Sequence, residues 1–512
     1  MSKTGKVWLV GAGPGDEGLL TLKAKMLLEE ADVIVYDALV SMEILSRIPP
    51  GKQMIYAGKR AGNHPVSQTE INKILFREAK QGKKVVRLKG GDPFIFGRGG
   101  EELELLAEEG IPFEVVPGIT SASAVPAYAG IPVTHRDFVS SFHVVTAHPR
   151  ENGCRQIDFK ALVRAGGTLV FLMGASSLSA ICQGLLDAGL EESMPAAVIE
   201  KGTTARQRRI TASVEELAKT AETAGVGTPA IILVGQVCGL EKKFGWSEKR
   251  ILGGRRFLIT RPRESSSEFA VSLRALGAQV IELPTIETRP IPPGREFKET
   301  LEEFGRTGRE AWLLFTSPAG VRIFFAQLRE MGMDVRRLFR KPAEVKVGAI
   351  GSATEEVLSE FGIFPEAVPK VYCAQALGEL VAEKAVPGSQ VLVLRAREGS
   401  GELLPPMQRA GLIVKDIGIY ETVYRKQEHL QERLKEMFQA GEIDAVTFTS
   451  GSTVRGFAET FAGNLDLHRV QAICIGEQTA AEAAKYGMQI QVAEKASIES
   501  MVEKIVKQFG RK

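Results

Sequence analysis

The stretch Val85-Val-Arg-Leu-Lys-Gly-Gly-Asp-Pro-Phe-Ile-Phe-Gly-Arg-Gly-Gly-Glu-Glu102 decides the fold of the N-terminal half. Its apolar start predicts a buried strand over Val85–Leu88, and Gly90-Gly-Asp-Pro93 predicts a turn where that strand ends. A helix is expected next, over Glu101–Glu109. A strand followed by a glycine turn and a helix is the repeating step of an α/β sheet.

The same alternation of short apolar runs and amphipathic stretches extends on both sides of this segment. A helix is predicted over Leu20–Glu30. Further strands are predicted over Val7–Val10, Val33–Tyr36, Val115–Val116, Val144–Thr146, Leu169–Met173, Ala196–Ile199 and Ile231–Val234. The pattern therefore predicts the α/β fold class.

Two more predicted strands end in glycine-bearing turns, Gly11-Ala-Gly-Pro-Gly-Asp16 and Pro117-Gly-Ile-Thr-Ser121. A dinucleotide fingerprint would need glycine at position 16, and Pro14 has no amide hydrogen for a phosphate, so the first motif alone also fits an ordinary turn. Ligands of open α/β sheets bind beyond the carboxyl ends of the strands. Three such turns therefore predict one cleft.

The C-terminal half contains an internal repeat. Leu258–Glu268 aligns with Leu392–Glu402, and two further pairs of blocks follow in the same order. These pairs are Phe315–Phe324 with Phe448–Phe457, and Ile350–Thr354 with Ile475–Thr479. Two copies of one α/β unit predict a two-lobed part. We predict domains over residues 1–245 and 254–512, with a charged, glycine-containing linker over 246–253.

Composition limits the function classes. The 512 residues carry a formal net charge of +3, which is not the basic field of a nucleic-acid binder. The first apolar run is too short for a signal peptide or a membrane span. Five scattered cysteines without a CxxC pair predict neither disulfides nor a metal site. We expect a cytoplasmic protein without nucleic-acid or membrane partners.

The N-terminal blocks resemble those of uroporphyrinogen-III C-methyltransferase over roughly residues 1–245. The blocks are the two turns and the stretch quoted above, together with Tyr36-Asp37, Gly58-Lys-Arg60, Gly130-Ile-Pro-Val-Thr-His135 and Glu200-Lys-Gly-Thr203. The resemblance implies a two-lobed tetrapyrrole methylase fold. It also implies S-adenosylmethionine (SAM) as cofactor and methylation of uroporphyrinogen III at C-2 and C-7, giving precorrin-2. It leaves open a homodimer through this half.

Site residues follow from this resemblance. It implies Asp37 as proton acceptor and Lys59 as its partner donor. The implied cofactor contacts are Pro14, Gly90, Gly91, Asp92, Ile95, Thr120, Ser121, Met173 and Gly202. The residues alone also allow a capping Asp37, a solvated Lys59 and a core Met173. Basic residues near the turns are candidates for the substrate carboxylates, namely Arg87, Lys89, Arg98 and Arg136.

The C-terminal half is similar to uroporphyrinogen-III synthase over roughly residues 254–512. The similar blocks are Thr260-Arg-Pro262, Phe315-Thr-Ser317, Val347–Thr354, Gly418-Ile-Tyr-Glu-Thr422, Phe448-Thr-Ser450 and Ile475–Thr479. The resemblance implies two α/β lobes joined by a strand ladder, in which the N-terminal segment packs with the C-terminal lobe. The implied reaction closes hydroxymethylbilane to uroporphyrinogen III with inversion of ring D.

Tyr420 is the candidate catalytic residue of this half. It lies inside a repeat block, and Ile286 occupies the matching place in the other copy. Substrate contacts are expected from Arg261, Ser317, Thr354, Ser450 and Thr479. Tyr420 also fits a position at the edge of the core, and the two threonines fit helix N-caps.

These features predict a bifunctional enzyme of siroheme or cobalamin biosynthesis, whose second half makes the substrate of its first. Three alternatives stay open at this point. The first half fits another tetrapyrrole methyltransferase, and the second fits a nonenzymatic two-lobed binding module. A nucleotide-binding oxidoreductase is disfavoured by Asp16.

Overall fold

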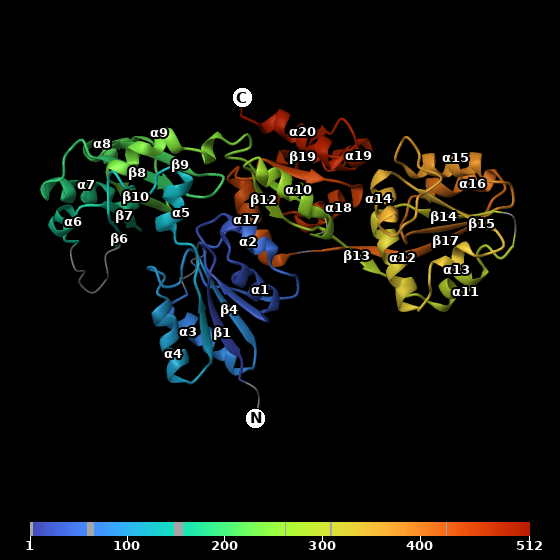
Figure 1. Cartoon of the computed structure of the whole chain (residues 1–512), viewed down its shortest axis with the longest axis horizontal. Helices are drawn as coiled ribbons and strands as arrows, with labels where there is room; N and C mark the ends of the chain where they lie inside the picture. The colour runs from blue at the N-terminus through green and yellow to red at the C-terminus, as the bar shows by residue number, and fades with distance from the viewer. Residues whose placement is uncertain are drawn as a thin grey trace. The chain divides into compact units, whose positions relative to one another are not determined.

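The computed structural model describes residues 4–58, 66–147, 157–261, 263–307, 310–425 and 427–511. Two compact units are present. The first comprises Met1–Leu283, Gln427–Thr449 and Phe461–Lys512, and the second comprises Pro284–Lys426 and Ser450–Thr460. Each unit consists of five-stranded sheets and surrounding helices, which confirms the predicted α/β class (Figure 1).

The first sheet is parallel throughout, in the order β3-β2-β4-β1-β5. Its strands are β1 (Lys6–Gly11), β2 (Val33–Tyr36), β3 (Gln53–Tyr56), β4 (Lys84–Lys89) and β5 (Phe113–Val116). Its helices are α1 (Leu22–Glu30), α2 (Met42–Arg47), α3 (Gln68–Lys80) and α4 (Gly99–Glu108). Strands β2 and β4 are almost wholly buried, as expected of strands covered on both faces.

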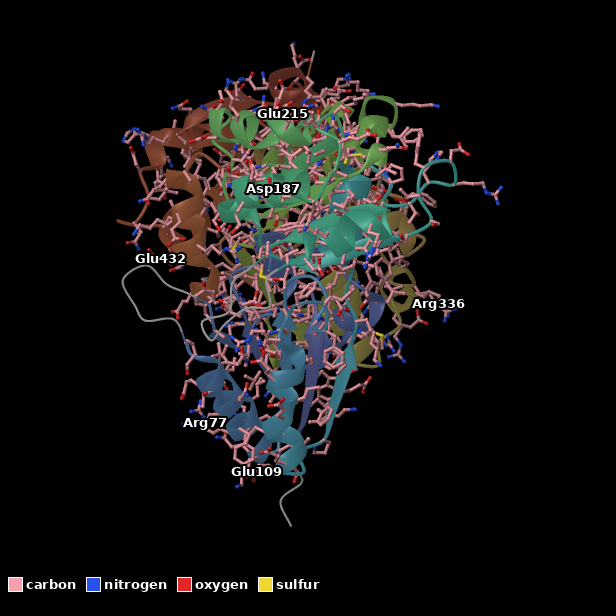
Figure 2. All side chains as sticks on the ribbon, turned by 90° about the vertical axis from the view of Figure 1, so that its left-hand side faces the viewer. Arg77, Glu109, Asp187, Glu215, Arg336 and Glu432 are labelled. Carbon is pink, nitrogen blue, oxygen red and sulfur yellow. The ribbon has the colours of Figure 1, made fainter. Side chains whose placement is uncertain are left out.

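The second sheet is mixed, in the order β6-β7-β10-β8-β9. Its strands are β6 (Phe142–Thr146), β7 (Thr168–Leu172), β8 (Pro195–Glu200), β9 (Arg208–Ser213) and β10 (Ala230–Val234). Its helices are α5 (Ser121–Tyr128), α6 (Phe159–Ala165), α7 (Leu178–Asp187) and α8 (Val214–Thr223). Figure 2 labels Asp187 and Glu215 on this lobe, and Arg77 and Glu109 on the first. The predicted strand over Leu169–Met173 stops one residue earlier, because Met173 is left-handed with φ 56°.

The third sheet completes the first unit, in the parallel order β12-β11-β18-β19-β20. Its strands are β11 (Arg256–Ile259), β12 (Gln279–Glu282), β18 (Ala445–Phe448), β19 (Gln471–Cys474) and β20 (Gln489–Val492). Its helices include α10 (Arg263–Ala275), α17 (Glu428–Gln439), α19 (Glu477–Ala484) and α20 (Ile498–Phe509). Strand β11 thus pairs on one side with β12 and on the other with β18, from the C-terminal part of the chain. The hydroxyl of Thr260 donates to the carbonyl of Thr447, 187 residues away, at 2.7 Å.

The second unit holds a sheet in the order β13-β17-β16-β14-β15. Its strands are β13 (Ile286–Pro290), β14 (Glu310–Phe315), β15 (Glu344–Ala349), β16 (Gln390–Ala396) and β17 (Ile413–Tyr424). Its helices include α11 (Arg295–Glu303), α12 (Pro318–Glu330), α14 (Ser352–Glu360), α15 (Ala374–Lys384), α16 (Leu404–Arg409) and α18 (Gly451–Thr460). Strand β17 runs parallel to β16 and antiparallel to β13.

The internal repeat appears as two equivalent strand orders, β12-β11-β18-β19 and β17-β16-β14-β15. The copies do not correspond to one sheet each. The first block of the first copy lies in β11, whereas its later blocks lie in β14 and β15 of the second unit. The second copy has the reverse arrangement, with β16 in the second unit and β18 and β19 in the first. Each sheet therefore combines strands from both copies.

The predicted linker, residues 246–253, contacts α5 inside the first unit. The indole nitrogen of Trp246 donates to the carbonyl of Ala127 at 3.0 Å, and the hydroxyl of Ser247 donates to the carbonyl of Tyr128 at 2.7 Å. The predicted domains, residues 1–245 and 254–512, remain a prediction from the sequence.

In the described ranges, no helix combines the length and apolar character needed to cross a membrane.

Candidate active site

Three glycine turns meet at the carboxyl edge of the first sheet. The amides and carbonyls of Gly13 and Gly91 bond reciprocally, at 3.2 and 2.7 Å. A Cβ added to Gly11 would lie only 2.5 Å from the Cα of Gly118. The turns that follow β1, β4 and β5 therefore pack backbone to backbone, which requires glycine.

Asp92 fastens these turns to each other. One carboxylate oxygen accepts from the amides of Phe94 and Ile95, at 2.8 and 3.2 Å. The other accepts from the amide of Gly118 at 3.0 Å. The sequence suggested that the Gly-Gly-Asp turn offers a carboxylate to a ligand. The structure shows that both oxygens already accept hydrogen bonds from the chain.

Asp16 has a comparable structural use, which explains why the first motif departs from a dinucleotide fingerprint. Its carboxylate caps the short helix Glu17–Leu19 through the amide of Gly18, at 2.7 Å. It also accepts from the hydroxyl of Tyr128 at 2.7 Å. Burial, together with this hydrogen bond to Asp16, raises the pKa of Tyr128. The aspartate thus ties the first turn to α5.

The turns open onto a cleft of about 740 Å³ within the first unit. Asp37 lines it, and Lys59 lies outside the described residues. All nine residues predicted to contact the cofactor also line it, namely Pro14, Gly90, Gly91, Asp92, Ile95, Thr120, Ser121, Met173 and Gly202. The structure thus brings together residues from widely separated parts of the sequence.

Strained backbone concentrates at this cleft. Among the described residues, the non-glycine positions with positive φ are Phe96, Arg98, Met173, Lys201 and Thr203. The first four line the cleft. Such conformations cost about 1–3 kcal/mol each and cluster at ligand sites. Their distribution makes this cleft the candidate ligand site.

The cleft wall is apolar and partly exposed. Leu39 is 62% exposed, Ile95 42%, Phe96 44% and Met173 47%. Met173 is therefore not the core residue that the sequence also allowed. Small-molecule sites combine such apolar walls with a few polar groups. The combination suits a ligand with large flat or apolar parts.

Asp37 follows β2 and is 22% exposed. One carboxylate oxygen accepts from the amide of Leu39 at 3.0 Å, so the side chain does cap a turn. The other lies 3.4 Å from the guanidinium of Arg87. The carboxylate is thus oriented from two sides while remaining at the cleft surface.

Two predicted substrate-binding residues are used inside the protein. Arg87 and Lys89 are buried and pair with the buried Glu102, at 3.2 and 2.5 Å. Burial and the neighbouring Arg87 lower the pKa of Lys89. Arg98 lines the cleft and pairs with the exposed Glu101, whereas the exposed Arg136 is not part of its lining. Arg87 does not line the cleft, whereas Lys89 does, although both pair with the carboxylate of Glu102 on α4.

In the second unit, three predicted residues lie at the carboxyl edge of the sheet. The hydroxyls of Ser317 and Tyr420 are 2.7 Å apart, and Ser317 also accepts from the amide of Gly320 to cap α12. Burial raises the pKa of Tyr420. Thr354 is 1% exposed in the first turn of α14, whose N-cap is Gly351.

The other predicted substrate contacts are distributed over both units. Arg261 follows β11, and burial lowers the pKa of its guanidinium. Thr479 is buried in the first turn of α19, whose N-cap is Gly476. These two belong to the first unit. Ser450 belongs to the second, where its hydroxyl accepts from the amide of Thr453 at 3.3 Å. Neither threonine is the N-cap that the sequence also allowed.

Sequence reasoning missed two groups of residues. Tyr372 is 49% exposed and packs on Gly351, where an added Cβ would meet its ring at 2.7 Å. Its only sequence signal is an aromatic residue outside every predicted element. The second group lines the cleft of the first unit from the C-terminal half, and comprises Arg256, Arg433, Met437 and Glu442. No local motif marks these four residues.

Two family models match the chain. Tetrapyrrole (Corrin/Porphyrin) Methylases matches residues 6–218, and Uroporphyrinogen-III synthase HemD matches residues 267–503. The chain is 44% identical over 506 residues to the porphyrin biosynthesis protein HemD of Ruminiclostridium josui, covering 99% of this chain and 98% of that relative. It is 43% identical over 340 residues to the uroporphyrinogen-III C-methyltransferase of Bacillus subtilis, covering 66% and 69%.

A solved structure is also similar to the first half. It is the uroporphyrin-III C-methyl transferase of Thermus thermophilus complexed with S-adenyl homocysteine, at 41% identity. The similarity covers 46% of this chain and 100% of that chain, with a TM-score of 0.40.

Proposed function

The chain belongs to the family of the porphyrin biosynthesis protein HemD, with a tetrapyrrole methylase region before a uroporphyrinogen-III synthase region, and we propose how each region acts. Membership makes it a bifunctional enzyme of tetrapyrrole biosynthesis. We propose that the methylase region transfers methyl groups from SAM to C-2 and C-7 of uroporphyrinogen III, giving precorrin-2. The synthase region supplies that substrate from hydroxymethylbilane.

The observation that carries the first proposal is the convergence of nine predicted cofactor residues on one cleft. Glycine turns leave backbone exposed there, and a Cβ at Gly91 would meet nothing within 4 Å. Among the described residues, the hydroxyl of Ser121 has no hydrogen-bond partner in the chain and is free for a ligand. Ile95 and Met173 offer apolar contact. These features fit SAM.

SAM supplies an already activated methyl group, so the protein mainly has to hold the acceptor carbon in line with it. A proton leaves the macrocycle during the reaction, and Asp37 is the proposed acceptor. Its contacts to Leu39 and Arg87 fix the orientation of its carboxylate. Lys59 remains the proposed donor on the family resemblance alone.

The test supplies uroporphyrinogen III and methyl-labelled SAM to the full chain. We expect two labelled methyl groups per macrocycle by mass spectrometry, at C-2 and C-7 by NMR. A single methyl group, or methylation at another ring carbon, would identify a different tetrapyrrole methyltransferase.

We propose that the synthase region removes water from hydroxymethylbilane and closes the ring with ring D inverted. The hydroxyls of Ser317 and Tyr420 are paired at the carboxyl edge of their sheet, where a leaving hydroxide can be hydrogen-bonded. Few acid–base groups are needed, because folding the bilane and excluding water do most of the work. Hydroxymethylbilane supplied without SAM should yield isomer III. Isomer I alone would indicate a binding module without synthase activity.

A further inference from the structure

Helix α17 belongs to the synthase region in sequence, yet it lies against the methylase region in space. Within the first unit it is adjacent to α2, the helix that follows the Asp37 loop (Figure 1). Arg433 and Met437 on α17 line the methylase cleft, together with Arg256 and Glu442. Part of that cleft wall is therefore supplied by the other half of the chain.

Arg433 bonds directly to the loop that carries Asp37. Its guanidinium donates to the carbonyl of Val40 at 2.7 Å and to the carbonyl of Ala38 at 3.4 Å. No acidic side chain among the described residues pairs with it. A planar guanidinium spanning two carbonyls fixes both the distance and the orientation of the segment between them. Arg433 thus holds both ends of the segment 38–40 through their carbonyls.

The clamp acts on two elements of the cleft. The Asp37 carboxylate accepts from the amide of Leu39, and the Asp37 carbonyl accepts from the amide of Val40, so displacing this turn displaces the carboxylate. The side chain of Leu39 covers Gly90, where an added Cβ would lie 2.5 Å from the Cβ of Leu39. The position of Arg433 is therefore coupled to the proposed base and to the Gly90 turn.

An ion network keeps this part of the chain in place. Arg256 is buried and contacts Glu43 on α2 and Glu442 after α17, both at 3.0 Å. Glu442 also pairs with Lys201 at 3.2 Å. Removing one partner of a buried charge pair is strongly destabilising, so such a network holds the two surfaces in one register.

From these contacts we propose that Arg433 is a positioning residue for methyl transfer, by which the synthase region completes the methylase cleft. The proposal rests on the proposed function of that cleft. The proposal predicts that methyl transfer depends on Arg433, a residue outside the methylase region. The synthase reaction should not depend on Arg433.

The test compares full-length wild type with Arg433→Gln, Arg433→Lys and the matched control Glu432→Gln. Glu432 is the preceding residue on α17, labelled in Figure 2, with a side chain that is 78% exposed. With supplied uroporphyrinogen III, Arg433→Gln should lower kcat roughly tenfold or more, because misplacing reacting groups by about 1 Å can cost that much. The Kd for SAM should change less than kcat, and the isomer III yield from hydroxymethylbilane should stay unchanged. Arg433→Lys keeps the charge and the donor capacity but loses the planar fork that reaches both carbonyls, and should fall between wild type and Arg433→Gln.

Hydrogen–deuterium exchange gives a readout that needs no turnover. The amides of residues 37–47 should exchange faster in Arg433→Gln than in wild type or Glu432→Gln. Unchanged exchange in that segment would overturn the proposal, even if the wild type proved to have no methyltransferase activity. Inactive wild type with the expected exchange would instead contradict the proposed function and leave the clamp standing. Equal kcat for Arg433→Gln and an active wild type would also overturn the proposal.

Discussion

The hydroxyl of Tyr420 lies 2.7 Å from the hydroxyl of Ser317, at the carboxyl edge of the sheet in the second unit. If this pair assists departure of the bilane hydroxyl, Tyr420→Phe should slow the synthase by about 5- to 150-fold, the equivalent of one hydrogen bond of ~1–3 kcal/mol. The readout is the ratio of uroporphyrinogen isomers, because spontaneous closure gives isomer I.

The control for this prediction is methylation of supplied uroporphyrinogen III, which Tyr420→Phe should not change. Ser317→Ala should produce a similar shift toward isomer I, since it removes the same pair from the other side. A wild-type rate of isomer III formation in Tyr420→Phe would make Tyr420 a packing residue.

Asp37→Asn should leave the Kd for SAM nearly unchanged and slow methyl transfer by about 10²–10⁴-fold, the usual cost of losing a general base. Asparagine keeps an oxygen that can accept from the amide of Leu39, so the turn itself should survive. Calorimetry and single-turnover assays separate the two quantities. Weakened SAM binding with normal saturated turnover would reassign Asp37 to cofactor binding.

The main effect expected of Gly91→Leu is a weaker affinity for SAM. Gly91 has φ 68° and open space where a side chain would start, on the lining of the cleft. Gly110 is a matched control, because it has φ 65° and equally open space but no part in the cleft lining. Gly110→Leu should cost similar stability through backbone strain and leave the Kd for SAM unchanged. Equal loss of affinity in both variants would show that strain, and not occlusion, is responsible.

Glu310→Gln should destabilise the second unit in a pH-dependent way. Burial raises the pKa of Glu310, but hydrogen bonds from Lys346, Trp312 and the amide of Val386 outweigh it and hold the pKa below its usual value. The charged form is thus favoured by folding. Its stabilisation is complete above the ordinary glutamate pKa and is lost as pH falls through the lower folded pKa. We expect a cost of about 1–3 kcal/mol at pH 7.

Urea unfolding followed by intrinsic tryptophan fluorescence tests this prediction. Trp312, which bonds to Glu310, reports on the second unit, and Trp8 and Trp246 report on the first. The difference in unfolding free energy between wild type and Glu310→Gln should narrow as the pH is lowered toward 3. Glu344→Gln removes an exposed carboxylate from the neighbouring strand and should show little effect. If the difference in unfolding free energy between wild type and Glu310→Gln did not change with pH, the loss of stability would come from altered packing and not from the lost charge.

Local sequence patterns predicted the strands and the cleft well, because glycine turns after buried strands are dictated by short-range sterics. The Gly90-Gly-Asp turn is a clear instance, since Gly11, Gly91 and Gly118 meet as expected. The roles of Arg87 and Lys89 were not predictable in the same way. Their burial depends on pairing with Glu102, a tertiary contact that no local pattern encodes.

Arg433 marks a second limit of sequence reasoning. It is one of several charged residues on an amphipathic helix, and nothing nearby in sequence distinguishes it from Glu432 or Lys435. Arg433 matters because α17 packs beside α2 in the folded chain. Its bond to Val40, just before α2, joins residues that are 393 positions apart in the sequence. The internal repeat likewise predicted two copies of one α/β unit but not the order of their strands. The packing of the N-terminal segment with the C-terminal lobe was implied only by the resemblance to uroporphyrinogen-III synthase, and in the structure β11 pairs with β18.

The exchange of blocks has a consequence for synthesis on the ribosome. Strand β11 pairs with β12 on one side, but its other neighbour, β18, is translated only after nearly the whole second unit has emerged. Until then β11 presents an open strand edge, which is a template for aggregation. Pairings between residues 187 apart, such as Thr260 with Thr447, also close slowly. All strands of the second unit's sheet, β13 to β17, are thus translated before β18, while the interrupted sheet of the first unit waits for the C-terminal strands.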